Sequence, residues 1–100
     1  MNDADVAAGL LSRGFIEVTE LNGMSVGARV RHRGEQWFEA HEHGTGTIER
    51  IFHKPESSWS RTYRRPDVEL IVKRDKPKFG ADDTHSFVAD YHIELIGAAA

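Results

Sequence analysis

Alternating apolar and polar positions predict short β-strands along most of this chain. The clearest run lies at 67–74, where Val68, Leu70 and Val72 share one phase. A period of two places such side chains on the same face of a half-buried strand. We therefore predict a strand at 67–74 whose apolar face points into the core.

A second strand is predicted where apolar residues alternate with arginine. In VGARVRHR, Val26, Ala28 and Val30 point to one side. One buried face and one solvated face are typical of an antiparallel sheet. His32 falls on the Val30 side, so we expect a half-buried imidazole there. The opposite side carries a basic row: Arg29, Arg31 and Arg33.

Two further strands are predicted at 44–52 and 86–96. In GTGTIERIF, Ile48 and Phe52 point inward, and the apolar Ile51 is out of phase, which indicates a β-bulge beside the glycines. SFVADYHIELI is expected to break near residues 89–90 into two short strands. Its inward positions share one register: Phe87, Ala89, Tyr91, Ile93 and Leu95.

The N-terminal segment differs, because its pattern at 3–13 is helical. Acidic residues occupy its first turn and Gly14 follows as a stop signal. Three apolar residues lie roughly along one face: Val6, Leu10 and Leu11. Residues 15–21 fit either a strand or a continuation of the helix, and Asn22-Gly23 is a turn signal.

The connections complete the predicted architecture. Residues 35–43 are expected to form a loop, and 75–83 a turn-rich one. The stretch at 53–66 is a long connection with a proline near each end, whose centre could extend the flanking strands into a twisted hairpin. We predict a mainly β fold, a five-stranded SH3-like barrel over 25–96, preceded by a short helix and lead-in at 1–24 and followed by a tail at 97–100.

Charge is distributed unevenly along the chain. Residues 1–28 carry one arginine against four acids, a net of −3. Residues 29–80 carry twelve Lys and Arg against eight acids, a net of +4, and residues 81–100 carry four acids and no Lys or Arg. A basic middle segment is one mark of a nucleic-acid face. It is equally consistent with acidic ends that neutralise the middle once the chain folds.

Several classes of function are disfavoured by composition. The absence of cysteine excludes disulfides and thiolate catalysis, and it fits a reducing compartment. No signal peptide or membrane span is recognised, so we expect a soluble, cytoplasmic protein. The GTG at 44–46 lacks the lysine and following helix of a phosphate-binding loop. We predict no enzyme activity and no cofactor.

One weak metal-binding candidate remains, the pair His41 and His43. Two histidines at i and i+2 can face one way on a strand, and imidazole suits zinc, copper or nickel. No third ligand is fixed by spacing. A solvated polar loop is the favoured interpretation.

The order of these motifs resembles a known small barrel. VGARVRH leads into GTGTIERI, then VELIVKRD, and the chain closes on YHIELI. This series is similar to the Tudor-like domains of bacterial repair helicases and of transcription regulators that dock on RNA polymerase; KOW-type and Mind-bomb-type barrels are looser matches. The resemblance implies a protein-docking module. Two departures, the inserted GEQWFEAHEH and the long 53–66 connection, fall where such barrels bind partners.

Aromatic and basic residues in those two insertions, with two arginines of the preceding strand, are the candidate binding surface. Tryptophan, tyrosine and arginine dominate protein hot spots, and arginine with aromatics also holds phosphates and stacks on bases. Docking on a protein in transcription or DNA-processing machinery is preferred, direct nucleic-acid binding through 29–78 is the first alternative, and a small phage-type virion component is the second. The candidates are Arg31, Arg33, Trp37, Phe38, Trp59, Arg61, Tyr63, Arg64 and Arg65.

Overall fold

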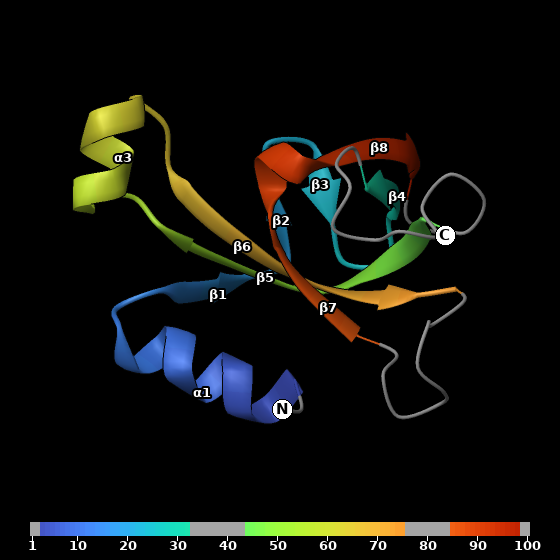
Figure 1. Cartoon of the computed structure of the whole chain (residues 1–100), viewed down its shortest axis with the longest axis horizontal. Coiled ribbons are helices and arrows are strands. Elements are labelled where there is room, and N and C mark those ends of the chain that lie inside the picture. The colour runs from blue at the N-terminus through green and yellow to red at the C-terminus, as the bar shows by residue number, and fades with distance from the viewer. Residues whose placement is uncertain (1–2, 33–43, 76–84, 99–100) are drawn as a thin grey trace.

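The protein folds as a twisted antiparallel sheet with a short N-terminal helix, which confirms the predicted mainly β class (Figure 1). The computed structural model describes residues 3–32, 44–75 and 85–98. The helices are α1 (Asp3–Ser12) and α3 (Ser58–Tyr63), and a 3-10 turn spans Asp90–His92. The strands are β1 (Ile16–Val18), β2 (Glu20–Leu21), β3 (Met24–Ser25), β4 (Arg29–His32), β5 (Thr45–Lys54), β6 (Asp67–Arg74), β7 (His85–Ala89) and β8 (Ile93–Gly97).

Strand β5 pairs with three other strands, β1, β4 and β6. The strand order is β7-β6-β5-β4-β8, and all of these pairs are antiparallel. The first part of β5 pairs with β4 and its last part pairs with β1, so one long strand serves two neighbours along the same edge. The terminal strands of this order, β7 and β8, are joined in sequence by the 3-10 turn.

One irregularity in β5 explains its apolar pattern. The register with β6 shifts between Ile48 and Arg50, which confirms the expected bulge. The extra residue, Glu49, allows Ile48 and Ile51 to face the same core although they are three positions apart. The main core is Ala28, Val30, Ile48, Ile51, Val68, Leu70, Val72, Val88 and Ile93.

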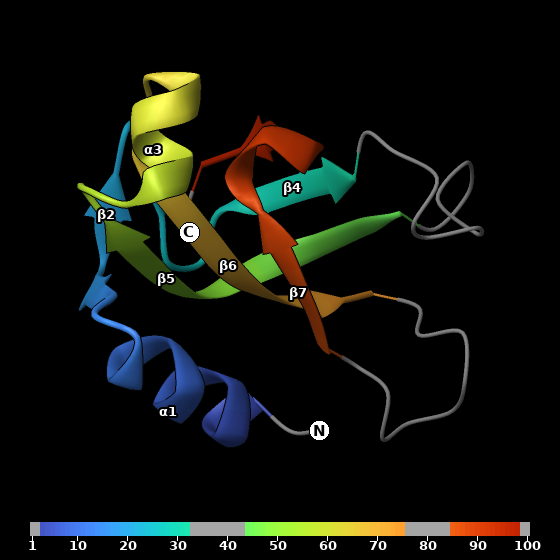
Figure 2. The ribbon, with the colours of Figure 1, turned by 60° about the vertical axis from the view of Figure 1, so that its left-hand side comes forward.

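A second, smaller core lies on the opposite face of the sheet. Phe52 and Ile71 are fully buried there by α1, which supplies Ala7 and Leu10, while Phe15 closes the cluster. Figure 2 shows α1 running along one side of β5 and β6. The prediction that Phe52 shares the core of Ile48 is therefore wrong, because the bulge places the two side chains on opposite faces.

The helix α1 follows the expected bounds but turns a different face to the sheet. Leu10 is buried at 3% exposure, whereas Leu11 is 48% exposed. The helix ends before Gly14, whose φ of +91° favours glycine, and the Lys54 ammonium donates to the Arg13 carbonyl at 2.7 Å. Residues 16–18 then form a strand, so the alternative of a longer helix is excluded.

The lead-in to β4 is a turn. Asn22 and Gly23 both have positive φ, as a type I′ hairpin turn between β2 and β3 requires. Gly27, with φ of +93°, then bends the chain before β4. Val26 consequently lies in the turn and is exposed, which corrects the prediction that it points inward with Val30.

The break predicted near residues 89–90 is confirmed, but the single inward register is wrong. Val88 is buried opposite Leu70, whereas Ala89 is only half-buried. The 3-10 turn interrupts the alternation of inward and outward side chains between β7 and β8. Ile93 is consequently buried opposite His32, and Leu95 is exposed. The side chains of Phe87 and Tyr91 lie outside the described part of the structure.

Candidate functional site

The most distinctive local structure is the helix α3 in the connection between β5 and β6. The sequence predicted a long connection whose centre could form a twisted hairpin, but the structure has a helix there. The Ser57 hydroxyl accepts from the Ser60 amide at 3.0 Å, and the Ser60 hydroxyl accepts from the Ser57 amide at 2.7 Å. This reciprocal capping box satisfies amides that a short helix leaves without partners. Arg64, at φ +57°, ends the helix in the left-handed conformation.

Two aromatic side chains of α3 pack on each other at the surface. The Trp59 and Tyr63 rings have centroids 4.9 Å apart and are tilted by 40°. They lie at i and i+4, which brings them together on one helical turn. Ser60 is buried against the body of the protein, whereas Tyr63 is 61% exposed. Tyr63 belongs to neither apolar core.

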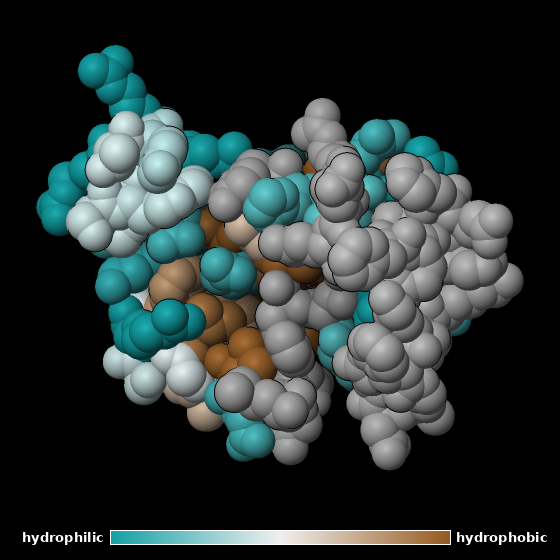
Figure 3. All heavy atoms as spheres, viewed as in Figure 1, coloured by the Kyte–Doolittle hydropathy of each residue, from teal (hydrophilic) through white to brown (hydrophobic). Residues whose placement is uncertain are grey.

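The arginines of this segment differ in their partners. The Arg65 guanidinium contacts the Asp90 carboxylate at 2.5 Å, linking the end of α3 to the 3-10 turn. Within the described part of the chain, the side chains of Arg61 and Arg64 enter no ion pair, and both are exposed. Figure 3 shows the pale side chains of α3 gathered at the upper left, with strongly hydrophilic ones around them. We call Trp59, Arg61, Tyr63 and Arg64 the α3 surface.

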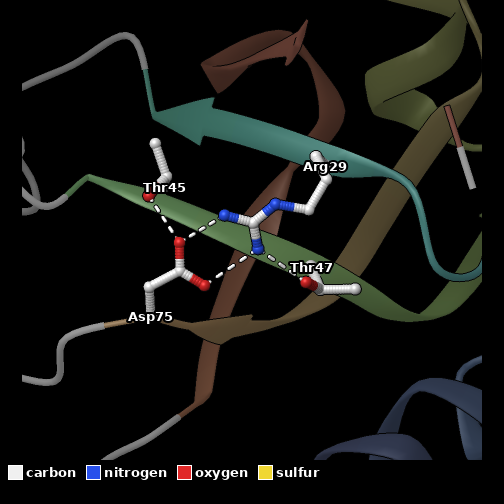
Figure 4. Close-up of polar contacts among 4 residues, drawn as sticks. All are labelled: Arg29, Thr45, Thr47 and Asp75. Atoms are coloured by element: carbon white, nitrogen blue, oxygen red, sulfur yellow. Dashed lines mark hydrogen bonds and ion pairs between the residues drawn. The ribbon is translucent and has the colours of Figure 1, made fainter. Parts of the chain in front are cut away.

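Three arginines of the sheet, Arg29, Arg31 and Arg50, are instead paired with acids of the same chain. Figure 4 shows Arg29 on β4 reaching across β5 to Asp75. The Arg29 guanidinium also donates to the Thr47 hydroxyl at 2.7 Å, and the Thr45 hydroxyl donates to Asp75 at 2.6 Å. Two more ion pairs use acids from the acidic ends of the chain: Arg50–Glu17 at 2.7 Å and Arg31–Glu94 at 3.8 Å.

These contacts support the interpretation that the acidic ends neutralise the basic middle. Glu17, Asp90 and Glu94 come from the two acidic ends, and each pairs with an arginine between positions 31 and 65. The face of the sheet that carries these pairs is therefore a mixed-charge surface.

Glu69 is a separate case, because burial raises the pKa of its carboxyl. The nearby Asp67 and Asp90 raise this pKa further, while Arg13 lowers it.

The contacts that Asp75 makes with Arg29 and Thr45 should make the free energy of unfolding depend on pH in the acidic range. Its hydrogen bond from Arg29, reinforced by Thr45, lowers the pKa of Asp75 from 3.8 to about 2. Because the pKa of Asp75 is lower in the folded state than in the unfolded state, its ionised carboxylate stabilises the fold. This contribution is fully present above pH 3.8 and is lost as the pH falls toward 2. Asp75→Asn should lower the free energy of unfolding by about 1 kcal/mol at pH 6, after discounting for solvent screening of a partly exposed pair.

Urea unfolding of both proteins at pH 6 and near pH 2 measures this difference. Glu49→Gln is a suitable control, because Glu49 is exposed and forms no ion pair among the described residues. The difference between wild type and Asp75→Asn should shrink at the lower pH. An unchanged difference would show that ionisation of Asp75 contributes nothing to stability.

The structure brings together only part of the predicted surface. Four predicted residues form the α3 surface and Arg65 adjoins it, but Arg31 lies opposite Thr45 at the far end of β5. The nine steps from Thr45 to Lys54 correspond to about 30 Å of strand. Arg33, Trp37, Phe38, His41 and His43 lie outside the described residues.

Histidine placement gives no metal centre in the described ranges. His32 is buried on the Val30 side, as expected of its phase although more deeply, and its ring stacks on His92 with centroids 5.7 Å apart. Across residues 3–32, 44–75 and 85–98, no group of three His, Cys, Asp or Glu side chains could hold a metal ion. The His41/His43 hypothesis stays a prediction.

Comparisons with known proteins add no family assignment. No protein-family model, curated protein or solved structure matches this chain. In the described part of the chain, neither helix is long and apolar enough to span a membrane. The α3 surface and the charge pairing around it are therefore the features from which a function can be inferred.

Proposed function

We propose that this chain is a non-enzymatic, cytoplasmic binding module that docks on a protein partner through α3. We further propose that its sheet is a five-stranded SH3-like barrel of Tudor-like type, made of β4, β5, β6, β7 and β8. The strand order supports this, because the two terminal strands, β7 and β8, are linked by only the three residues of the 3-10 turn. The apolar cluster enclosed by these strands is a second support.

The observation that carries the docking proposal is the composition and exposure of the α3 surface. An exposed tyrosine packs there on a tryptophan and is flanked by two arginines that enter no ion pair with any other described residue. Tyrosine, tryptophan and arginine are the residue types that dominate protein hot spots. Aromatic side chains provide a large contact area and lose little conformational entropy on binding. The surface lies on a helix fixed by a capping box, so it is ordered before a partner arrives.

Charge pairing favours a protein partner over nucleic acid. Arg29, Arg31 and Arg50 would form the phosphate-contacting row on the sheet, yet each is paired with a carboxylate of this chain. Releasing them onto phosphates would leave those carboxylates beside the nucleic-acid backbone. The resemblance to helicase-associated and polymerase-docking domains supports a partner in transcription or DNA processing.

Substitution of Tyr63 tests the docking surface directly. A protein partner isolated with the wild-type chain should bind Tyr63→Ala at least about 30-fold more weakly, the loss expected of a hot spot worth 2 kcal/mol or more. Isothermal titration calorimetry measures this. Thr62→Ala, on the same exposed helix, is the matched control and should retain wild-type affinity, while thermal unfolding checks that both variants remain folded. Equal affinities for all three proteins would exclude α3 as the docking surface.

A further inference from the structure

The α3 surface also indicates the chemistry of its partner. Resting on the docking function proposed above, we infer that the surface binds an acidic protein segment in which carboxylates flank one bulky apolar side chain. Three features of the described residues lead to this: the distribution of carboxylates around the arginines, the position of the aromatic pair, and the narrow extent of positive charge.

The first feature is that, among the described residues, four arginines are paired with carboxylates of this chain, whereas Arg61 and Arg64 enter no ion pair. Ion pairs to Arg29, Arg31, Arg50 and Arg65 all use acids of the chain itself. The Arg61 and Arg64 side chains are both exposed at the C-terminal end of α3. Guanidinium and carboxylate match geometrically and form charge-assisted hydrogen bonds, so acidic side chains are the complement of this end of the helix.

The second feature is the aromatic pair beside those arginines. Tyr63 lies between Arg61 and Arg64 in sequence, and its ring rests on Trp59. A partner side chain that covers the exposed tyrosine buries apolar area, at about 25 cal/mol per Å². Burial of that contact also lowers the local dielectric and strengthens adjacent ion pairs. One apolar anchor between acidic residues would engage both kinds of group at once.

The third feature limits the partner to a segment with few charges. Arg61 and Arg64 are three residues apart, about 4.5 Å along a helix, in a protein of net charge −3. Double-stranded DNA laid along the 35 Å length of the molecule would carry about 20 phosphates over that span, counting both strands. Phosphates that reach Arg29, Arg31 or Arg50 would meet arginines already paired with carboxylates of the chain, and those carboxylates would repel them. A peptide with two or three carboxylates matches the patch without that repulsion.

Selection from a random 12-residue peptide library displayed on phage tests this inference without a known partner. The full-length chain is immobilised, and selected peptides are synthesised and measured by fluorescence anisotropy at low and near-physiological salt. Binding is compared among wild type, Tyr63→Ala and the double variant Arg61→Gln/Arg64→Gln. Thr62→Ala serves as the control. A labelled duplex DNA and a single-stranded oligonucleotide are measured in parallel.

We expect selected peptides to carry at least two Asp or Glu within four residues of an aromatic or aliphatic anchor. Their affinity should fall at least about tenfold in the arginine double variant and in Tyr63→Ala, and it should be unchanged in Thr62→Ala. Peptides that need Tyr63 but show no acidic enrichment would overturn the acidic-segment inference and leave docking intact. Peptides indifferent to Tyr63, or no enrichment at all, would contradict both. Tighter binding of the oligonucleotides, lost in the arginine variant, would replace the peptide with a phosphate ligand.

Discussion

Leu10→Ala should lower the free energy of unfolding by about 3 kcal/mol. Leu10 of α1 belongs to the same buried cluster as Phe52 and Ile71 and is only 3% exposed. Leucine-to-alanine changes in a core cost 2–5 kcal/mol, because transfer free energy is lost and a cavity remains. In a domain of this size, with a total stability of about 5–15 kcal/mol, the loss is large. Equilibrium urea unfolding measures it.

The adjacent leucine provides the control for this prediction. Leu11 is 48% exposed, so Leu11→Ala should change stability by no more than about 0.5 kcal/mol. If the two variants were equally stable, α1 would not be packed on the sheet as described. A larger loss for Leu11→Ala than for Leu10→Ala would mean that the opposite face of the helix is buried.

Gly46→Ala should destabilise the protein by about 2–3 kcal/mol. A Cβ atom at position 46 would lie 2.6 Å from the Lys73 carbonyl oxygen and 2.7 Å from the Val72 Cγ1. The carbonyl belongs to the β6 backbone, so it cannot move aside without disturbing the β5–β6 pairing. Overpacking of this kind typically costs 1–3 kcal/mol. Thermal and urea unfolding both measure the effect.

Gly9→Ala is the control substitution, because a Cβ atom at position 9 meets no neighbouring atom. Nothing lies within 4 Å of a Cβ at position 9, which is inside α1. Alanine should therefore stabilise the helix by up to about 1 kcal/mol through its higher helix propensity. Opposite signs for the two substitutions are the expected result. A neutral Gly46→Ala would mean that β5 and β6 are farther apart there than the structure places them.

The sequence predicted the elements whose side chains alternate over one buried face. Val68, Leu70 and Val72 are buried as their period requires, and the out-of-phase Ile51 correctly indicated the bulge. The pattern did not reveal that Phe52 and Ile71 pack under α1. Ile71 alternates outward and was therefore expected to meet solvent, whereas Phe52 was assigned to the wrong face because of the bulge. Only the tertiary position of the helix buries both side chains.

The candidate site was predicted in composition but not in structure. Six residues are too few for helical periodicity to appear, and the aromatic and basic residues at 59–65 suit a hairpin equally well. A local signal was present in Ser57 and Ser60, three residues apart, whose side chains form the capping box. The pairing of Arg65 with Asp90 joins residues 25 positions apart, so no local pattern could have indicated it.

Fluorescence anisotropy with labelled single- and double-stranded DNA and RNA, at low and near-physiological salt, tests the proposed protein-docking function most directly. We expect no binding at micromolar protein concentration even at low salt, because Arg29, Arg31 and Arg50 are paired within the chain and the net charge is −3. Micromolar or tighter binding that weakens steeply with salt would contradict it, and the basic middle segment would then be a phosphate-contacting face.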